Sequence, residues 1–281
     1  MTEANLEQTR VWNEVAGPKW VAMQRQLDAQ LESLGEAGMA RLEWRAGDRV
    51  LDVGCGAGAT TLALARRVAP GEVVGVDVSE PLVALARRRA AGADNLRFEL
   101  GDAQTMRFAD QFDVVYSRFG VMFFDDPVAA FNNLRESLRP GGRLAVVCWR
   151  AMEANPWVSA PLAAARSLLP EVPKPTPPGA PGPFAFADEQ RLRKILADAG
   201  FVDVEVRAHD EDMVLGGEGM EAAVHSVTQI GPLGAALNGA STELREQAKA
   251  AVRAMFEQHL GPRGVTFKAG VWLVLARSPG R

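Results

Sequence analysis

One short run, Val50 to Gly58, carries residue types that suit a nucleotide site. It begins as an apolar strand, Arg49 to Val53, breaks into glycines, and opens a helix near Thr60 and Thr61. Glycines at alternate positions let the backbone turn tightly and approach a ligand closely, because they lack Cβ atoms. The helix that follows points its free N–H groups and the positive end of its dipole at that ligand. This pattern favours a nucleotide-type ligand and leaves open which one.

The glycines alone do not identify the nucleotide. Gly54 to Ala59 matches the dinucleotide fingerprint G-x-G-x-x-G/A, and Asp77 lies at about the spacing expected of a ribose-binding acid. A glycine-rich turn that merely packs a helix on a strand has the same pattern. Features further along the chain separate these interpretations.

Acidic residues mark three predicted strands in a fixed order. Asp52 lies inside the first, where dinucleotide folds usually keep an apolar residue. Asp77 ends the second, Val73 to Asp77, and its carboxylate can accept both hydroxyls of a ribose. Asp102 follows the third, Leu96 to Leu100, and suits an adenine amino group. Ligands of such sheets bind at the carboxyl ends of the strands, so these acids should share one edge. Taken singly, each acid also fits a helix cap or a turn.

Two later segments continue this ordered series of strands and loops. A strand from Phe112 to Ser117 opens into Arg118-Phe119-Gly120, and a turn from Leu138 leads into a strand over Leu144 to Trp149. Together, D-V-G-C-G-A-G, G-D-A-Q and L-R-P-G-G-R-L resemble the class I S-adenosylmethionine-dependent methyltransferases. The resemblance is strongest to the small-molecule enzymes similar to quinone C-methyltransferases. It covers residues 46–150 strongly and the rest of the chain more loosely.

The resemblance implies S-adenosyl-L-methionine as cofactor and S-adenosyl-L-homocysteine as product. The methyl group would pass by in-line displacement to an oxygen, nitrogen or carbon of a small organic acceptor. By this resemblance the methionine end is held by Asp52, Gly54, Gly56 and Gly58, the ribose by Asp77, and the adenine by Asp102, Ala103 and Gln104. The wall near the sulfonium would be lined by Ser117 and Phe119, and the predicted cofactor-binding set is completed by Trp20, Cys55 and Val78.

Methyl transfer needs little acid–base machinery, although proton removal from the acceptor can require a base. The histidines of the chain are His209, His225 and His259. Of these His225 is the best placed as a base, with a packing or surface role as the alternative. Arg118 could hold an anionic acceptor, or could instead form a salt bridge to Asp125 or Asp126. We expect no catalytic metal, because no cluster of His, Cys and carboxylates has ligand spacing.

Composition and net charge limit the class of methyl acceptor. With 281 residues and 47% apolar content, the chain can bury a full core as one elaborated domain. A formal charge of −4 disfavours a nucleic-acid substrate, because phosphate backbones are bound chiefly by Lys and Arg. The basic cluster Arg87 to Arg89 is predicted to be a solvated helix face. The fourth strand also lacks the N-P-P-Y or D-P-P-Y of amino-methylating enzymes. A small, partly apolar acceptor is what remains.

Cysteine usage and the N-terminus indicate where the protein works. Cys55 and Cys148 are predicted to be buried thiols, which is typical of a reducing compartment. Met1 to Arg10 is polar and lacks the apolar core of a signal peptide, and no apolar run is long enough to span a membrane. We therefore expect a cytoplasmic protein. Separately, we expect a monomer or homodimer.

Alternating strands and helices over residues 48–149 predict a Rossmann-like α/β fold. We expect a doubly wound, mostly parallel seven-stranded sheet with an antiparallel last strand, plus a helical cap. A helix from Asp188 to Ala199, stopped by Gly200, should lead into a strand over Val202 to Arg207. A last strand, Gly270 to Ala276, should close the sheet.

We expect a single domain, in which the segments outside the core hold the substrate. The predicted parts are an N-terminal helical lid (1–37), a cofactor-binding core (46–150), a proline-rich insertion (151–187), the rest of the core (188–211 and 265–281) and a helical cap (212–264). The lid should hold one or two amphipathic helices interrupted at Gly17-Pro18, with Trp12 and Trp20 on one face. Pro170 to Pro183, with seven prolines in 14 residues, should be an extended loop. Helices are predicted over Glu221 to Gln229 and Thr242 to His259.

Two other functions are consistent with the motifs. An S-adenosylmethionine-binding regulator without turnover would keep the same cofactor residues. A nicotinamide-dependent oxidoreductase would use the glycine fingerprint with Asp77 as its ribose acid.

Overall fold

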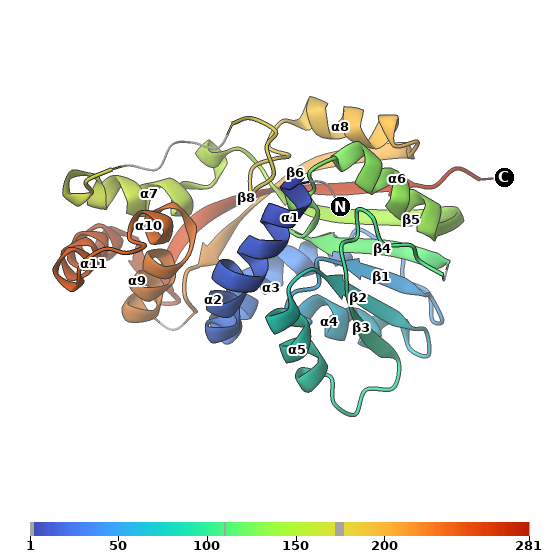
Figure 1. The fold of residues 1–281 in the computed structure, drawn as a ribbon, viewed down its shortest axis with the longest axis horizontal. Coiled ribbons are helices and arrows are strands. Elements are labelled where there is room, and N and C mark those ends of the chain that lie inside the picture. The colour runs from blue at the N-terminus through green and yellow to red at the C-terminus, as the bar shows by residue number, and fades with distance from the viewer. Residues whose placement is uncertain (1–2, 110, 172–176, 218, 281) are drawn as a thin grey trace.

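The computed structural model describes residues 3–109, 111–171, 177–217 and 219–280. Its centre is one sheet with the strand order β3-β2-β1-β4-β5-β8-β6 (Figure 1). These strands are β1 (Val50–Val53), β2 (Val73–Asp77), β3 (Leu96–Leu100), β4 (Phe112–Arg118), β5 (Leu138–Trp149), β6 (Val202–Val214) and β8 (Gly264–Arg277). The neighbours from β3 to β5 run parallel, and β8 runs antiparallel to both β5 and β6. The predicted Rossmann-like sheet with an antiparallel last strand is confirmed, and a short strand β7 (Leu260–Gly261) pairs beside it.

Helices cover both faces of the sheet because side chains alternate along each strand. The helices that pack on it are α3 (Gln24–Met39), α4 (Ala59–Val68), α5 (Glu80–Arg89), α6 (Pro127–Ser137) and α8 (Glu189–Asp198). On one face Tyr116 shares a buried cluster with Met39 of α3 and Leu64 of α4. On the other face the neighbouring Val115 lies in the cluster of Phe131 of α6. The strand order reverses between β1 and β4, so a ligand site is expected at their carboxyl ends.

The N-terminal helices differ from the prediction. A helix α1 (Glu3–Arg10) runs into a π-helix (Val11–Val15), then α2 (Ala16–Ala22) and α3. Gly17-Pro18 therefore does not interrupt the helices, because Pro18 lies in the first turn of α2, where proline is tolerated. Leu34 of α3 is fully buried in the core, so α3 is a core helix. The lid expectation then applies only to α1, the π-helix and α2, which we call the N-terminal segment.

A cap extends from one end of the sheet (Figure 1). It consists of α7 (Pro156–Ala165), α9 (Met220–Gln229), α10 (Gly231–Ala236) and α11 (Thr242–Phe256). The predicted helices at Glu221 and Thr242 are confirmed, with the second ending in a 3₁₀ turn at Glu257–His259. In the predicted proline-rich loop, residues 177–183 form neither helix nor strand, and 172–176 lie outside the described residues.

The strands that carry the cap are longer than predicted. Beyond the end of β5 at Trp149, β6 and β8 continue as a two-stranded ribbon to the register pair Val214 and Thr266. The predicted strand ended at Arg207, but the structure continues it through Asp210 to Asp212, because a two-stranded ribbon leaves such side chains in solvent. Asp212 pairs there with Lys268 of β8.

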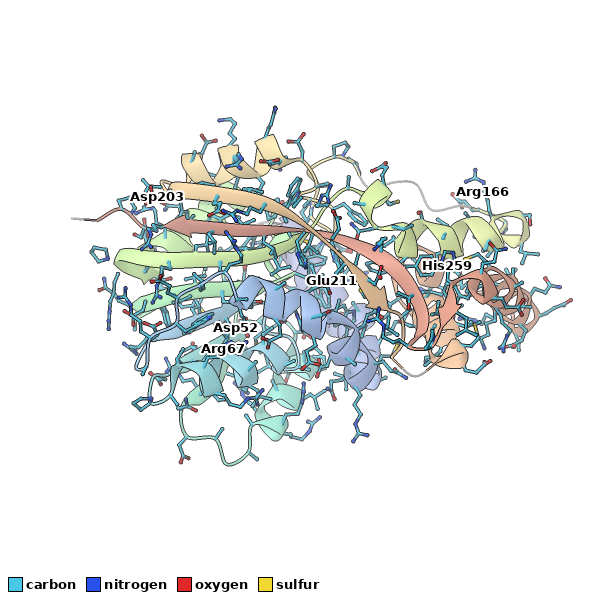
Figure 2. All side chains as sticks on the ribbon, turned by 180° about the vertical axis from the view of Figure 1, so that it is seen from behind. Asp52, Arg67, Arg166, Asp203, Glu211 and His259 are labelled. Atoms are coloured by element: carbon cyan, nitrogen blue, oxygen red, sulfur yellow. The ribbon has the colours of Figure 1, made fainter. Side chains whose placement is uncertain are left out.

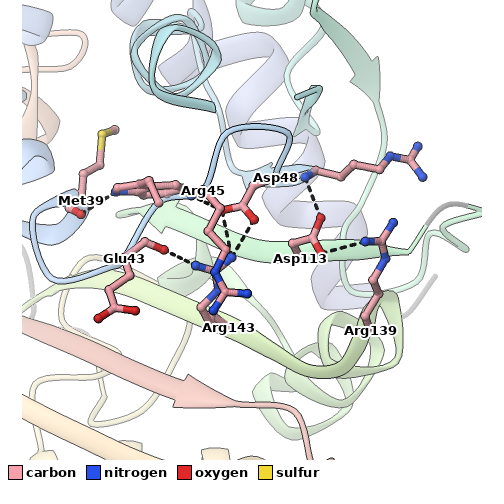
Figure 3. A network of polar contacts seen from close by, with 9 residues as sticks. Met39, Glu43, Arg45, Asp48, Asp113, Arg139 and Arg143 are labelled. Atoms are coloured by element: carbon pink, nitrogen blue, oxygen red, sulfur yellow. Dashed lines mark hydrogen bonds and ion pairs between the residues drawn. The ribbon is translucent and has the colours of Figure 1, made fainter. Parts of the chain in front are cut away.

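A buried ion pair lies at the edge of the sheet where the parallel strands begin, opposite the edge formed by their carboxyl ends (Figure 3). Arg143 of β5 donates from Nη2 to both carboxylate oxygens of Asp48, each at 2.9 Å, and both side chains are buried. Arg143 also donates to the carbonyl oxygen of Glu43. A second pair joins Arg139 to Asp113, which also accepts from the amide of Arg49. These contacts connect the entry of β1 to β4 and β5, and they lie away from the ligand edge.

Candidate functional site

The glycine loop, Gly54 to Gly58, connects β1 to α4. Gly54, Gly56 and Gly58 have φ values of +67°, +53° and +83°, which other residues rarely adopt. A Cβ on Gly54 would lie 2.4 Å from the Cα of Gly120, and one on Gly58 would lie 2.8 Å from Phe98. A Cβ on Gly56 would meet no atom within 4 Å. The outer glycines are therefore required for packing, whereas Gly56 faces open space.

Asp52 anchors this loop from inside the sheet. Its side chain is fully buried, and Oδ2 accepts hydrogen bonds of 2.6 Å from both Thr60 and Thr61 at the start of α4. Its other oxygen, Oδ1, is buried without a hydrogen-bond partner among the described residues. Burial raises the pKa of this carboxyl to about 6, against the lowering effect of the two threonines. An unpaired buried oxygen of this kind is rare and marks a place where a ligand can bind.

Asp77, at the end of β2, lies against the same loop. Its carboxylate accepts from the amide of Gly56 at 2.8 Å and from that of Ser79 at 2.9 Å. Burial raises its pKa, and these two hydrogen bonds oppose that rise. The structure thus places the predicted ribose acid beside the open glycine.

Asp102 is in contact with the N-terminal segment. It accepts a hydrogen bond of 2.7 Å from the side-chain amide of Asn5 in α1, and one of 2.9 Å from the amide of Gln104. The Gln104 side chain accepts from the amide of Asp126, and the Ala103 carbonyl accepts from Asn133. Asp102 therefore lies at the ligand edge. The polar groups of Ala103 and Gln104 instead form hydrogen bonds with residues in and just before α6.

A cleft opens between the glycine loop and the helices α2 and α3. It is a narrow cleft that is partly open to solvent. Of the predicted site residues it is lined by Trp20, Gly54, Cys55, Gly56, Arg118 and Phe119. Apolar walls are supplied by Leu27, Leu31 and Leu82, and polar groups by Gln24, Asp28 and Thr60.

The residues after β4 contribute differently. Ser117 is fully buried, and its hydroxyl donates to the carbonyl of Val53 at 2.7 Å, so it holds β4 to β1 instead of facing the cleft. Phe119 has φ of +64° and stacks on Trp149 with ring centroids 4.1 Å apart. A non-glycine residue held at positive φ is strained, and such residues gather at functional sites. Arg118 turns to α3, where Nη1 donates to the carbonyl of Leu31 at 3.2 Å.

The predicted solvated face at Arg87 to Arg89 is wrong for Arg89. That side chain donates to the carbonyl of Ala57 in the glycine loop at 2.5 Å and to Asp28 of α3 at 2.7 Å. It therefore links α5, the loop and α3. Sequence periodicity places Arg89 on a helix but carries no signal for this long-range pair.

No described histidine lines the cleft. His225 has an exposed side chain on α9 of the cap and does not line the cleft, so its role as a base stays a prediction. His209 on β6 bonds to Glu211 at 3.0 Å, and His259 stacks on Phe267 at 4.0 Å. Figure 2 shows His259 in the cap, well apart from Asp52 in the core. The cap was expected over the carboxyl edge of the sheet, yet its histidines stay outside the cleft.

The N-terminal segment is bonded to the ligand edge at several points. Asn13 donates to the carbonyl of Val78 at 2.9 Å and accepts from the amide of Glu80 at 2.9 Å. The expectation that Trp12 and Trp20 share a face is confirmed, since their rings meet edge to face at 5.7 Å. Trp12 also meets Phe123, just after β4, at 5.2 Å. This aromatic cluster was not predicted, because Phe123 gave no signal of its own.

Comparison with known proteins relates the chain to one group of enzymes. A family model described as a methyltransferase domain matches residues 50–142. A demethylmenaquinone methyltransferase of Staphylococcus aureus (strain JH9) is 31% identical over 175 residues, which cover 58% of this chain and 72% of that protein.

Solved structures share the fold. The YcgJ protein of Bacillus subtilis superposes with a TM-score of 0.57 at 21% identity, covering 89% of this chain and 99% of that one. A phosphoethanolamine N-methyltransferase 2 of Haemonchus contortus, solved with phosphomonomethylethanolamine and S-adenosylhomocysteine, has a TM-score of 0.53 at 19% identity. That match covers 89% of this chain and 53% of the other.

Two features are absent from the described residues. None of the helices there combines the length and apolar character needed to cross a membrane. Likewise, no three His, Cys, Asp or Glu side chains in the described ranges are grouped as metal ligands.

Proposed function

Because this chain belongs to the class I S-adenosylmethionine-dependent methyltransferases, we propose that it methylates a small, partly apolar organic acceptor beside the glycine loop. S-adenosylmethionine is its cofactor. The observation that carries the proposal is the cleft itself, where Gly54 and Gly56 form one side and the apolar and aromatic groups of α2, α3 and Phe119 form the other.

The residues of this edge fit the cofactor. Gly56 leaves open space at the loop, and the orphaned oxygen of Asp52 lies buried behind it. We propose that the loop holds the methionine end, that Asp77 accepts from the ribose, and that Asp102 accepts from the adenine amino group. Trp20 and Phe119, both on the cleft, would cover the region where the methyl group is transferred.

The chain contributes positioning more than proton transfer. S-adenosylmethionine, when bound, supplies a methyl group already activated on a sulfonium sulfur. Trp20, Leu27 and Leu31 exclude water from the cleft and restrict how an acceptor can enter it. Alignment of this kind can contribute roughly 7–11 kcal/mol to lowering a barrier. No histidine is among the described residues of the cleft, so we infer that the acceptor either loses its proton before it enters or carries a nucleophile that needs no base.

We propose a planar, largely apolar acceptor such as a quinol or a phenol. Support comes from the aromatic row behind the cleft, where Phe119 stacks on Trp149 and Trp149 meets Trp157 at 5.1 Å. The Staphylococcus aureus relative is named for demethylmenaquinone, an acceptor of the same chemical class. A formal charge of −4 opposes a nucleic-acid substrate.

The other predicted functions find no support in the fold or the relatives. We further propose that the protein is cytoplasmic and a monomer or homodimer. Its two cysteines, Cys55 and Cys148, are buried and unpaired, which suits a reducing compartment.

A turnover assay with candidate acceptors tests this function. The purified protein is incubated with S-adenosylmethionine and a panel of quinols, phenols and amines, and S-adenosylhomocysteine formation is followed by mass spectrometry. The proposal expects product with quinols or phenols and none with duplex DNA or RNA. Product with amines alone would overturn the acceptor class, and binding without product from any acceptor would favour a regulatory protein.

A further inference from the structure

Only two of the described side chains that line the cleft carry charge, Asp28 and Arg118. The Asp28 carboxylate is already neutralised, because Arg89 pairs with it at 2.7 Å and Gln24 donates to it. Arg118 is different. Its only hydrogen bond in the described part of the chain goes to the backbone carbonyl of Leu31, at 3.2 Å.

A guanidinium has five N–H donors in a planar fork, and one contact leaves most of them unused. The ion pairs formed among the described residues include none to Arg118. The side chain is half-buried at the end of β4, where its backbone pairs in register with Val147 of β5. Its Cδ packs against Gly35 of α3, where an added Cβ would lie only 3.0 Å away. Strand and helix thus fix this cation at the wall of the cleft.

The Asp52 carboxylate is fully buried in β1, the strand that pairs beside β4. The charge of Arg118 acts on it, lowering the pKa of that carboxyl against the effect of burial. Arg118, at the end of β4, therefore lies on the cleft beside Gly54 and Gly56, whereas the Asp52 charge stays buried in the neighbouring strand. A ligand end bearing a carboxylate would match the free donors of Arg118 at this place.

We propose that Arg118 binds the α-carboxylate of the amino-acid end of the cofactor, instead of an anionic acceptor. This proposal rests on the proposed function. Arg118 and the glycines line one cleft, so a ligand end held by the loop lies within reach of the guanidinium. Arg–carboxylate pairs are bidentate and charge-assisted, which suits a planar fork with free donors. A carboxylate left unpaired among Leu27, Leu31 and Trp20 would be costly to bury.

The test compares two product analogues by calorimetric titration. S-adenosylhomocysteine has the carboxylate, and its decarboxylated form, S-adenosyl-3-thiopropylamine, keeps the ammonium but lacks the carboxylate. Wild-type protein should bind the first about 10- to 100-fold more tightly. Arg118→Gln should weaken S-adenosylhomocysteine by that factor and change the affinity for the decarboxylated analogue by less than about twofold. Arg66→Gln, an exposed α4 variant that removes the same charge, should leave both affinities unchanged.

The outcomes separate the two proposals. If wild-type protein binds neither analogue, the proposed function fails. If it binds both equally, or if Arg118→Gln weakens both equally, the carboxylate assignment is wrong. If Arg118→Gln lowered only the affinity for the acceptor, Arg118 would be assigned to acceptor binding instead. Should Arg118→Gln fail to fold, Arg118→Lys keeps the charge and should lose part of the discrimination, and the wild-type comparison stands without any variant.

Discussion

Asn5 and Asp102 lie 97 positions apart in the chain, and a hydrogen bond of 2.7 Å joins their side chains. The donor is the amide of Asn5, and the acceptor is the carboxylate that we assign to the adenine amino group. Asn5 thus presents to Asp102 the same kind of N–H group that adenine would. The N-terminal segment therefore covers the adenine end of the proposed cofactor site and competes for its acid.

Replacing Asn5 by Ala should release that acid. We expect Asn5→Ala to bind S-adenosylhomocysteine more tightly, by about 1–2 kcal/mol, because the cofactor no longer displaces a hydrogen bond to a charged group. Asn13→Ala is the matched control, since Asn13 holds the same segment through Val78 and Glu80 without touching Asp102. Calorimetric titration measures both variants. Equal effects from the two would mean that Asn5 only fastens the segment.

Asp77→Ala should weaken S-adenosylhomocysteine binding by about 2–4 kcal/mol, because two ribose hydroxyls lose a charged acceptor. Asp77 also accepts from the amides of Gly56 and Ser79, so the loop itself loosens in this variant. Asp77→Asn keeps one acceptor oxygen and should lose less. Titration of both variants, alongside their thermal unfolding, distinguishes the causes. Unchanged affinity in Asp77→Ala would show that the ribose is held elsewhere.

The pH dependence of stability should reveal the buried Asp52. Its pKa is about 6 in the folded protein, against 3.8 for an unperturbed group. A raised folded-state pKa favours the folded state at low pH, and this contribution is lost as pH rises from 3.8 to about 6. Asp52→Asn removes the titration. The free energy of unfolding of wild type minus that of Asp52→Asn should therefore fall, on the order of 3 kcal/mol, across this window. Urea denaturation at several pH values measures it, and a difference that stays constant with pH contradicts the account.

The buried pair at the opposite edge should matter for stability and not for the site. Asp48→Ala leaves Arg143 buried without its partner (Figure 3), and we expect a loss of about 3–5 kcal/mol in the free energy of unfolding. Arg67→Ala breaks a more exposed pair with Glu36 and should cost less than about 1 kcal/mol. At temperatures where it stays folded, Asp48→Ala should bind S-adenosylhomocysteine as wild type does. A weaker affinity there would mean that this edge couples to the ligand edge.

Local pattern was enough for the strands that build the site. An apolar run that ends in Asp77, or just before Asp102, predicts both the strand and the acid of the proposed site. This is possible because ligand-binding residues of such a sheet lie at the ends of its strands. The extension of β6 was missed because the alternating apolar pattern ends at Val206, and only pairing with β8 makes Asp210 to Asp212 part of a strand.

Contacts between distant segments could not be predicted. The Arg89 link to Asp28 and Ala57 depends on how α5 meets α3 across the loop. The choice of His225 depended on where the cap places α9, and nothing local encodes that placement. Ser117 was assigned to the wall by its position after β4, but its hydroxyl bonds inward to Val53.

A calorimetric titration of wild-type protein with S-adenosylhomocysteine, with NADH as the control ligand, shows which nucleotide the glycine loop binds. We expect saturable binding of S-adenosylhomocysteine near a 1:1 ratio and no measurable heat of binding with NADH. Binding of NADH alone would contradict it, because the glycine loop and Asp77 would then belong to a dinucleotide site.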